Sequence, residues 1–291
     1  MATLDILLST PWLLYFVVTF VSLCIGSFLN VVILRLPKMM QQEWRCQCEA
    51  FLEVAEGERK QEDRVTLSSP ASTCPSCGHK IRAWENIPVV SYLLLGGKCS
   101  GCKSHISIRY PAIEAVTALF SVLTIVILGP SVTALWALLL VWALVALTVI
   151  DFDTQLLPDS ITLPLMWLGL ILSYFGFLGE FTSAFWGAVI GYLSLWSVYW
   201  LFKLATGKEG MGHGDFKLLA ALGAWLGWEL LPAIILLSSL VGAVVGISLM
   251  IFKKHGREVP IPFGPYLAAA GLLCLWFGAE IQALWFGLLG A

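Results

Sequence analysis

The sequence predicts an all-α membrane protein with about eight transmembrane helices and a small metal-binding domain between the first two. Of its 291 residues, 58% are hydrophobic and only 12% are charged. The mean hydropathy is +0.85. A soluble domain of this length does not need so much apolar surface, whereas helices that face lipid do. The metal-binding domain is predicted from two closely spaced cysteine pairs in the one long polar stretch.

The apolar runs have the lengths of membrane helices. A span needs about 20 predominantly apolar residues. We place spans at residues 12–34, 110–129, 132–150, 160–178, 183–203, 216–228, 231–252 and 264–288. No basic region precedes the first run and no small-residue cleavage site stands out after it. We therefore expect a retained span rather than a signal peptide.

The basic residues test this topology independently. Eight spans place the connections 35–109, 151–159, 204–215 and 253–263 on one side of the membrane. All 17 Lys and Arg residues lie in or beside these connections. The positive-inside rule makes that side cytoplasmic and puts both termini on the other side. A seven-span model would break this separation. No feature indicates a nucleic-acid partner.

Four cysteines form two C-x-x-C turns in the predicted cytoplasmic segment. These cysteines are Cys74, Cys77, Cys99 and Cys102. This spacing lets four thiolates converge on one structural zinc ion, and cytoplasmic thiols stay reduced. We expect Gly78 and Gly101 to supply the tight turns. His79 and His105 are alternative ligands, and free or disulfide-bonded cysteines are the competing interpretation. Cys46 and Cys48 belong to no obvious site.

Two aspartates stand where apolar runs meet the cytoplasmic side. Asp151 follows the third run, and Asp215 ends the glycine-rich turn 210–215 before the sixth, 64 residues later. One ionised carboxylate can take a proton from water while a protonated partner donates to the scissile carbonyl. Two like charges a few ångström apart cannot both ionise cheaply, so the pair is expected to share a proton. Such a pair is typical of an aspartyl protease acting at the bilayer.

For each neighbouring polar residue, a structural role is an alternative to a catalytic one. Asp159 is placed to cap the fourth span, and Asp153 is either a solvated loop acid or a supporting residue. Glu209 is interpreted as a surface charge. His213 either influences the active site or is a loop histidine without a functional role. Lys217 either positions the active site or contacts lipid headgroups. Glycines at 210, 212 and 214 lack Cβ atoms and would allow close approach by a substrate strand.

These motifs together resemble one family over nearly the whole chain. The sequence is similar to the bifunctional prepilin leader peptidase/N-methyltransferases of type IV pilus and type II secretion systems, in aspartic peptidase family A24. The matching stretches are residues 26–37, both cysteine turns, and residues 85–92, 109–114, 151–159, 212–217 and 262–265.

The resemblance implies a fuller account of function. Asp151 and Asp215 would be the catalytic dyad, cutting the short basic leader from prepilins and pseudopilins at the cytoplasmic face of the bacterial inner membrane. The new N-terminal residue, usually Phe, would then be methylated with S-adenosylmethionine. Residues 1–34 would be the first span, residues 35–109 the zinc-binding, methyltransferase-associated domain, and residues 110–291 the peptidase domain. The acids of the loop 151–159 are expected to meet the basic leader.

The sequence indicates the residues of the methyltransferase activity less clearly than those of the peptidase activity. No G-x-G-x-x-G motif follows a strand, so no Rossmann-type cofactor site is predicted, and the cofactor-binding residues are unknown. The turn at residues 96–98 offers close approach to a ligand or is a plain loop before the second cysteine turn. Asn30, Glu85 and Glu114 are polar residues within the family-like stretches, and none receives a role.

Two other functions compete with the leading one. The first is a presenilin-like protease that cuts within spans, against which the cytoplasmic motifs and the cysteine domain argue. The second is a transporter or channel, since intramembrane acids and glycine-interrupted helices also suit ion pathways. No predicted acid lies deep in a span, which argues against transport.

Overall fold

The structure is a computed structural model that describes residues 9–53, 65–253 and 262–289. Within these ranges the chain is helical and forms no strand. The α-helices in these ranges are α2 (Pro11–Phe51), α3 (Val90–Leu94), α4 (Arg109–Leu128), α5 (Val132–Thr154), α6 (Asp159–Tyr174), α7 (Phe181–Thr206), α8 (His213–Leu226), α9 (Leu231–Lys253) and α10 (Gly264–Leu289). Each predicted apolar run is a helix, which confirms the all-α prediction.

Six of the described helical segments are long and apolar enough to cross a membrane. They are α2, α4, α5, α7, α10 and the segment Trp228–Ser248, which joins a short 3-10 turn to α9. The other two predicted spans are shorter helices, because α6 has 16 residues and α8 has 14. The chain is therefore a multi-pass membrane protein in which two of the eight expected spans fall below the usual length.

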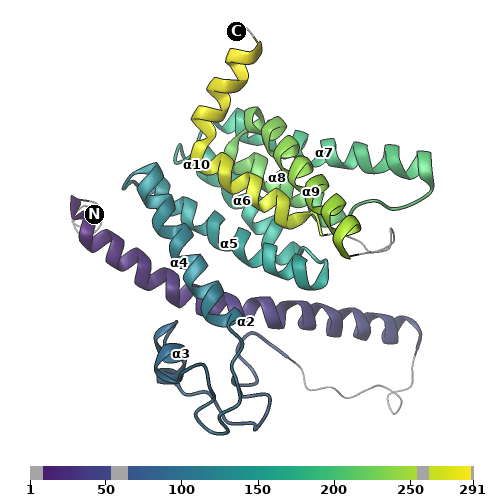
Figure 1. Cartoon of the computed structure of the whole chain (residues 1–291). Helices are drawn as coiled ribbons and strands as arrows, with labels where there is room; N and C mark the ends of the chain where they lie inside the picture. Colours follow the sequence, from purple (N-terminus) through teal and green to yellow (C-terminus); the bar gives the residue numbers. More distant parts are fainter. Residues whose placement is uncertain (1–8, 54–64, 254–261, 290–291) are drawn as a thin grey trace. The chain divides into compact units, whose positions relative to one another are not determined.

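The chain divides into two compact units, residues 1–125 and 126–291. In the first unit, α2 and α4 pack closely around Gly26 (Figure 1). A Cβ atom at Gly26 would lie 2.7 Å from the Cα atom of Glu114. The Asn30 amide donates to the carbonyl of Tyr110 at 3.1 Å, which adds a polar link between the two helices.

Helix α2 is much longer than the predicted span. The apolar run ends near residue 34, but the helix continues to Phe51 for a total of 41 residues. At 1.5 Å per residue its length is roughly 60 Å, about twice the thickness of the bilayer core. Pro37 lies inside the helix without ending it. The residues after it are mostly Met, Gln, Glu and Arg, which favour helix.

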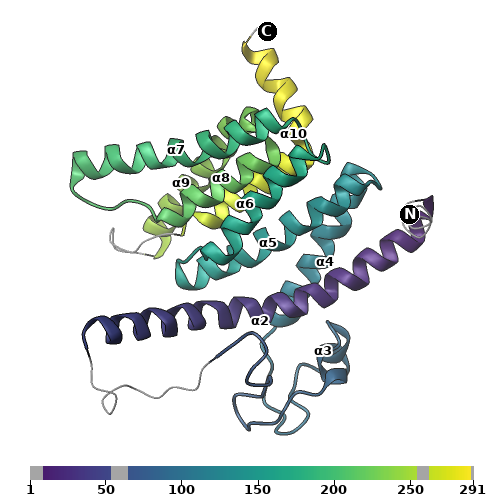
Figure 2. The same ribbon diagram turned by 180° about the vertical axis from the view of Figure 1, so that it is seen from behind.

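Residues 65–108 contain short turns and little regular structure. Figure 2 shows them as loops around α3, within the first unit. Isolated antiparallel bridges pair Thr73 with Lys80 and Lys98 with His105, so each closes a turn that contains one cysteine pair. Such a segment has little hydrophobic core and needs another source of stability.

The second unit is built around α8. Ten of its 14 residues are buried, on all sides of the helix, because α6, α7, α9 and α10 pack near it (Figure 1). Gly187 of α7 and Gly223 of α8 bring the two backbones into direct contact. A helix that is apolar all round is expected in such an interior position. This arrangement fixes the first turn of α8, which contains Asp215.

Candidate active site and metal centre

Asp151 occupies the last turn of α5. The sequence placed it just beyond the span, but the helix continues to Thr154 and ends at Gln155, which has a left-handed φ of 54°. The N–H of Gln155 donates to the carbonyl of Asp151 at 2.9 Å and closes this turn. The side chain of Asp151 is buried, with 5% relative exposure of the residue.

Asp215 occupies the first turn of α8. It is also buried, at 6% relative exposure. Among the described residues, its Oδ1 atom has no hydrogen-bond partner. Its carboxylate is close enough to that of Asp151 for their charges to interact. The fold therefore brings together the two acids that the sequence paired, although one ends a helix and the other begins one.

Gly264 holds the carboxylate of Asp151. The backbone N–H of this residue, the first of α10, donates to Oδ2 of Asp151 at 2.9 Å. A Cβ atom at Gly264 would lie 2.6 Å from the same oxygen. Leu157 lies against both Gly264 and Gly214, and so it links the first turn of α10 to the first turn of α8. Sequence reasoning noted the Pro-Phe-Gly-Pro motif at 262–265 but did not predict this contact.

The three glycines before Asp215 serve different purposes. A Cβ atom at Gly210 would meet the ring of Phe202 at 2.9 Å, and one at Gly214 would meet Cβ of Leu157 at 2.7 Å. These two glycines are needed for packing inside the protein. A Cβ atom at Gly212 would meet only Oδ2 of Asp215, at 3.6 Å. Among the three, Gly212 alone fits the expected open approach to the acid.

The neighbouring polar residues are engaged elsewhere. Both carboxylate oxygens of Asp159 accept from Nζ of Lys217 at 2.7 Å, which links the start of α6 to α8. Glu209 pairs with Lys203 at 2.8 Å on the surface. The ring of His213 packs 5.1 Å from that of Tyr199. The charge of Asp159 is therefore paired with Lys217 and is not used in the reaction.

Asp153 stays on the exposed side of the last turn of α5. The sequence grouped it with Asp159 in a loop without basic residues, expected to meet a basic leader. That group is smaller than expected, because Lys217 on α8 neutralises Asp159. Asp153 is exposed, whereas Asp151 is buried.

The four predicted cysteine ligands converge in the first unit. Their sulfur atoms all lie within 4.8 Å of one another, and none forms a disulfide. The Sγ atoms of Cys74 and Cys102 are 3.8 Å apart. A tetrahedral zinc shell with Zn–S bonds of about 2.3 Å separates its sulfur atoms by about 3.8 Å. The donor set and its size therefore fit a metal ion of this kind.

The surroundings favour the thiolates of Cys74 and Cys102. Hydrogen bonds from the backbone of Ser76 and the side chain of Ser104 lower the pKa of Cys74 to about 6. Hydrogen bonds to Ser104 likewise lower the pKa of Cys102. The backbone at His79 favours the thiolate of Cys77, but the neighbouring sulfurs outweigh it and raise its pKa to about 11. Four sulfurs this close share too much negative charge to ionise together unless a cation binds them.

The two cysteine turns have the same backbone hydrogen bonds. Gly78 has a positive φ of 71°, as expected, and its N–H donates to the carbonyl of Cys74. The prediction for Gly101 is wrong, since Lys103 occupies the equivalent position with a φ of 61°. The turn needs a left-handed residue directly after its second cysteine, and Gly101 precedes that cysteine. A Cβ atom at Gly101 would make an ordinary contact, 3.4 Å from Cβ of His79.

His79 supports the cluster without joining it. Its Nε2 atom lies 3.1 Å from Oε2 of Glu85 and 3.1 Å from the hydroxyl of Ser100, which belongs to the other cysteine turn. The N–H of Arg82, then Ser100 and His79, hold the pKa of Glu85 down at about 2. Glu85 is therefore an ionised bridge between the turns. His105 contributes a backbone bridge to Lys98.

The remaining unassigned residues make structural contacts. The carboxylate of Glu114 accepts the N–H of Val89 at 2.8 Å, and Val89 has an unusual φ of 59°. Gly96 and Gly97 both have positive φ, and a Cβ atom at Gly97 would lie 2.9 Å from the hydroxyl of Tyr92. The first contact joins this segment to α4, and the packing of Gly97 against Tyr92 supports the plain-loop interpretation of residues 96–98.

Comparison with known proteins gives a consistent result. The model of the type IV leader peptidase family matches residues 138–247, and that of the bacterial peptidase A24 N-terminal domain matches residues 20–128. Relatives named prepilin leader peptidase/N-methyltransferase occur in Aeromonas salmonicida (strain A449), 54% identical over 271 residues and 93% of each chain, and in Pseudomonas aeruginosa, 54% identical over 281 residues, 97% of this chain and 96% of the relative. Another, from Stutzerimonas stutzeri, is 53% identical over 283 residues and 97% of each chain. No solved structure matches the chain.

Proposed function

The chain belongs to the type IV leader peptidase family, and we propose that it cuts prepilins with Asp151 and Asp215 at the cytoplasmic boundary of the membrane. Its two activities are prepilin leader cleavage and N-methylation, as in the relatives that match nearly the whole chain. The observation that supports the dyad most strongly is the buried, unpartnered Oδ1 atom of Asp215 beside a second buried carboxylate. An unsatisfied buried acceptor destabilises a fold and persists where function uses it.

The two acids have unequal surroundings, which suggest their roles. Oδ2 of Asp151 accepts the N–H of Gly264, and a hydrogen bond of this kind favours a carboxylate that is ionised. Oδ1 of Asp215 has no donor among the described residues and lies in a buried position, which favours the protonated acid. Asp151 then takes a proton from the attacking water, and Asp215 donates its proton to the scissile carbonyl. The peptide bond is broken without a covalent intermediate.

The substrate suits this position. A prepilin carries a short basic leader followed by an apolar helix, so its cut site lies at the edge of the bilayer. Gly212 leaves space next to Asp215 for an extended substrate strand. Asp153, exposed two residues after Asp151, is the acid that we assign to the basic leader. The distribution of Lys and Arg supports a cytoplasmic active site and outward-facing termini, and we also propose that the membrane is the bacterial inner membrane.

The cysteine cluster and the second activity complete the proposal. We assign zinc to Cys74, Cys77, Cys99 and Cys102, where it holds together a segment that has almost no core of its own. The methyl group comes from S-adenosylmethionine and is transferred to the amine that cleavage exposes. Pseudopilins of type II secretion systems are the second substrate class.

A two-readout assay tests this function. Purified protein is incubated with a prepilin and S-adenosylmethionine, and leader removal and methylation are followed by mass spectrometry. We expect Asp151→Asn and Asp215→Asn each to abolish leader removal while both still methylate a pilin that was cut beforehand. Cleavage that survives either substitution would disprove the dyad, and Asp153 and Asp159 would then be tested.

A further inference from the structure

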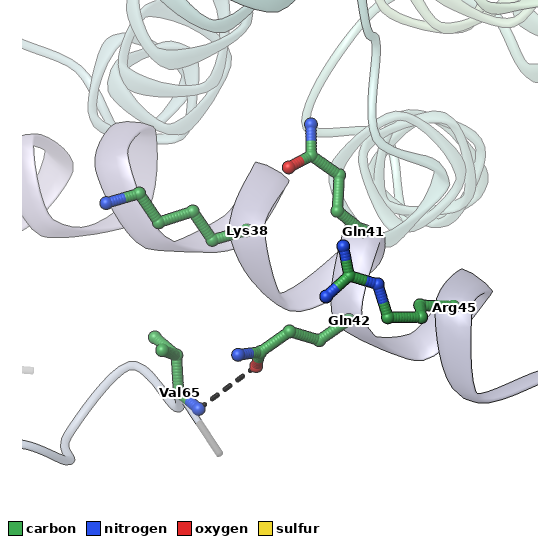
Figure 3. A pocket seen from close by; sticks show the side chains of 5 residues that line it. All are labelled: Lys38, Gln41, Gln42, Arg45 and Val65. Atoms are coloured by element: carbon green, nitrogen blue, oxygen red, sulfur yellow. Dashed lines mark hydrogen bonds between the residues drawn. The ribbon is translucent and has the colours of Figure 1, made fainter. Parts of the chain in front are cut away.

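Two cavities of the described structure differ in their lining. At the first, between α2 and the loop at Val65, the amide oxygen of Gln42 accepts the N–H of Val65 at 3.1 Å and attaches the loop to the helix (Figure 3). The second has a volume of about 60 Å³ and lies where α6 ends, α7 begins and α8 ends, wholly within the second unit. Three side chains of its lining carry oxygen atoms: Ser173, Glu180 and Ser183.

The two serine hydroxyls of this second cavity have oxygen atoms that lack a donor. The hydroxyl of Ser183 donates to the carboxylate of Glu229, so its oxygen has only lone pairs for a further partner. The backbone of Gly227 lies directly against this pair, because a Cβ atom there would meet both oxygens. Ser173 is 4% exposed, and its Oγ atom has no hydrogen-bond partner among the described residues. A buried hydroxyl of this kind destabilises a fold unless a bound group satisfies it.

The charge around the cavity is negative. Glu180 lines the cavity, and Glu229 is held against the lining by Ser183. Neither carboxylate forms an ion pair with a described residue. The cavity is built within residues 110–202 and 218–252, and neither stretch of sequence contains Lys, Arg or His. In the second unit the described basic residues lie at the opposite ends of α7, α8 and α9. The ligand is therefore a cation from outside the chain.

The size of the cavity and its oxygen atoms favour a primary ammonium group. Drug-sized ligands need cavities of roughly 300–1,000 Å³, so this cavity holds only a few heavy atoms. A primary ammonium has three N–H donors, which match the three oxygen-bearing side chains of the lining. A calcium ion takes about six to eight oxygen ligands, which is more than these side chains supply.

The neighbouring aromatic residues place the cavity at the depth of lipid headgroups. Tyr174 and Trp228 directly follow Ser173 and Gly227 of the lining, and they are 70% and 46% exposed. Tyr and Trp are enriched where a membrane protein meets the headgroups. The distribution of Lys and Arg supports the outer side of the membrane for this end of the helices, opposite the aspartate pair.

We propose that the cavity lined by Ser173, Glu180 and Ser183 binds the ammonium headgroup of phosphatidylethanolamine from the outer leaflet. The three N–H groups donate to the two hydroxyl oxygens and to the carboxylate of Glu180. Glu229 adds negative charge through its hydrogen bond with Ser183. The bound lipid holds the ends of α6 and α8 against the start of α7, and it takes part in neither of the two reactions.

The test measures lipid binding to the full-length protein in neutral detergent. Phosphatidylethanolamine or phosphatidylcholine with the same acyl chains is titrated, and native mass spectrometry gives the lipid-bound fraction. Phosphatidylcholine keeps the positive charge but has no N–H group. We expect it to bind at least about 10-fold more weakly, because hydrogen bonds from a charged donor are lost.

Two variants and a matched control locate the site. We expect Glu180→Gln and Ser173→Ala each to weaken phosphatidylethanolamine binding roughly 5- to 10-fold. Ser173→Ala removes one oxygen that has no partner in the protein, so it separates ligand binding from folding. The control Glu280→Gln removes an exposed acid of α10 outside the lining and is expected to bind like the wild type. Prepilin cleavage at the wild-type rate shows that each variant is folded.

Four outcomes would overturn the proposal. The first is equal binding of the two lipids by the wild type, and the second is wild-type affinity in both Glu180→Gln and Ser173→Ala. An equal loss in Glu280→Gln would place the lipid elsewhere. Displacement of the lipid by an equal concentration of calcium would identify a metal site, and displacement by free ethanolamine would identify a site for small amines.

Discussion

Replacing Gly264 by alanine tests how the active site is held. The substitution keeps the N–H that donates to Asp151 but adds a Cβ atom 2.6 Å from Oδ2 of that acid and 3.1 Å from its carboxyl carbon. An ordinary contact begins at 3.4 Å, so the carboxylate has to retreat by about 0.8 Å. Leu157, at 3.2 Å from the same Cβ position, restricts movement of the backbone in the other direction.

A shift of this size has a large kinetic effect. Misplacement of a catalytic group by about 1 Å reduces the rate roughly 100-fold, equivalent to about 2.7 kcal/mol of transition-state stabilisation. We expect Gly264→Ala to lower kcat for prepilin cleavage by about this factor and to leave KM nearly unchanged, since the substrate-facing side of Gly212 is untouched.

The assay compares three proteins. Cleavage of a prepilin is followed over time in the wild type, in Gly264→Ala and in Gly179→Ala, whose new Cβ atom would meet no atom within 4 Å. Methylation of a pre-cleaved pilin reports on the integrity of each protein. Wild-type cleavage by Gly264→Ala would refute the geometric reasoning, as would an equal loss of both activities, because that would indicate general misfolding.

Three further predictions concern the fold and the cysteine cluster. Gly187→Leu should destabilise the protein by about 1–3 kcal/mol or more, because the backbone of Gly223 in α8 lies directly against Gly187. Thermal unfolding in detergent measures this loss, and an unchanged Tm would contradict the packing of α7 against α8. Cys74→Ser should remove stoichiometric zinc whereas Cys46→Ser should not, as elemental analysis of the purified proteins will show; equal zinc in both would exclude the site. Glu85→Gln should lower Tm at pH 7, and because the pKa of Glu85 is depressed from 4.5 to about 2, the difference from the wild type should be complete above about pH 4.5 and vanish as the pH falls toward 2. A difference that grew on acidification, at equal metal content, would contradict the hydrogen bonds that keep Glu85 ionised.

The helices could be predicted from the sequence because each is a long apolar run. The end of α2 could not, since the hydrophobic signal stops near residue 34 while the helix continues through polar residues of high helix propensity. The last turn of α5 was missed for a similar reason. Acidic residues at 151 and 153 resemble a loop, but the left-handed Gln155 ends the helix only after them.

The site was predictable in its chemistry but not in its supports. Asp151 and Asp215 stand out because carboxylates are rare beside apolar runs, and four cysteines at this spacing indicate a metal. The donation from Gly264 to Asp151 crosses 113 residues of sequence, and no local pattern encodes it. Lys103 adopts a positive φ that composition assigns to glycine. The pairing of Asp159 with Lys217 likewise depends on the packing of α6 against α8.

Binding of a transition-state analogue tests the aspartate pair most directly. A prepilin peptide with a hydroxyethylene group in place of the scissile amide puts a hydroxyl where both carboxylates would hold the tetrahedral intermediate. We predict that it inhibits cleavage competitively and binds the wild type at least about 100-fold more tightly than the unmodified peptide binds the inactive Asp215→Asn variant. This advantage should be lost in both Asp151→Asn and Asp215→Asn. Equal affinity of the analogue for the wild type and both variants would contradict catalysis by this pair.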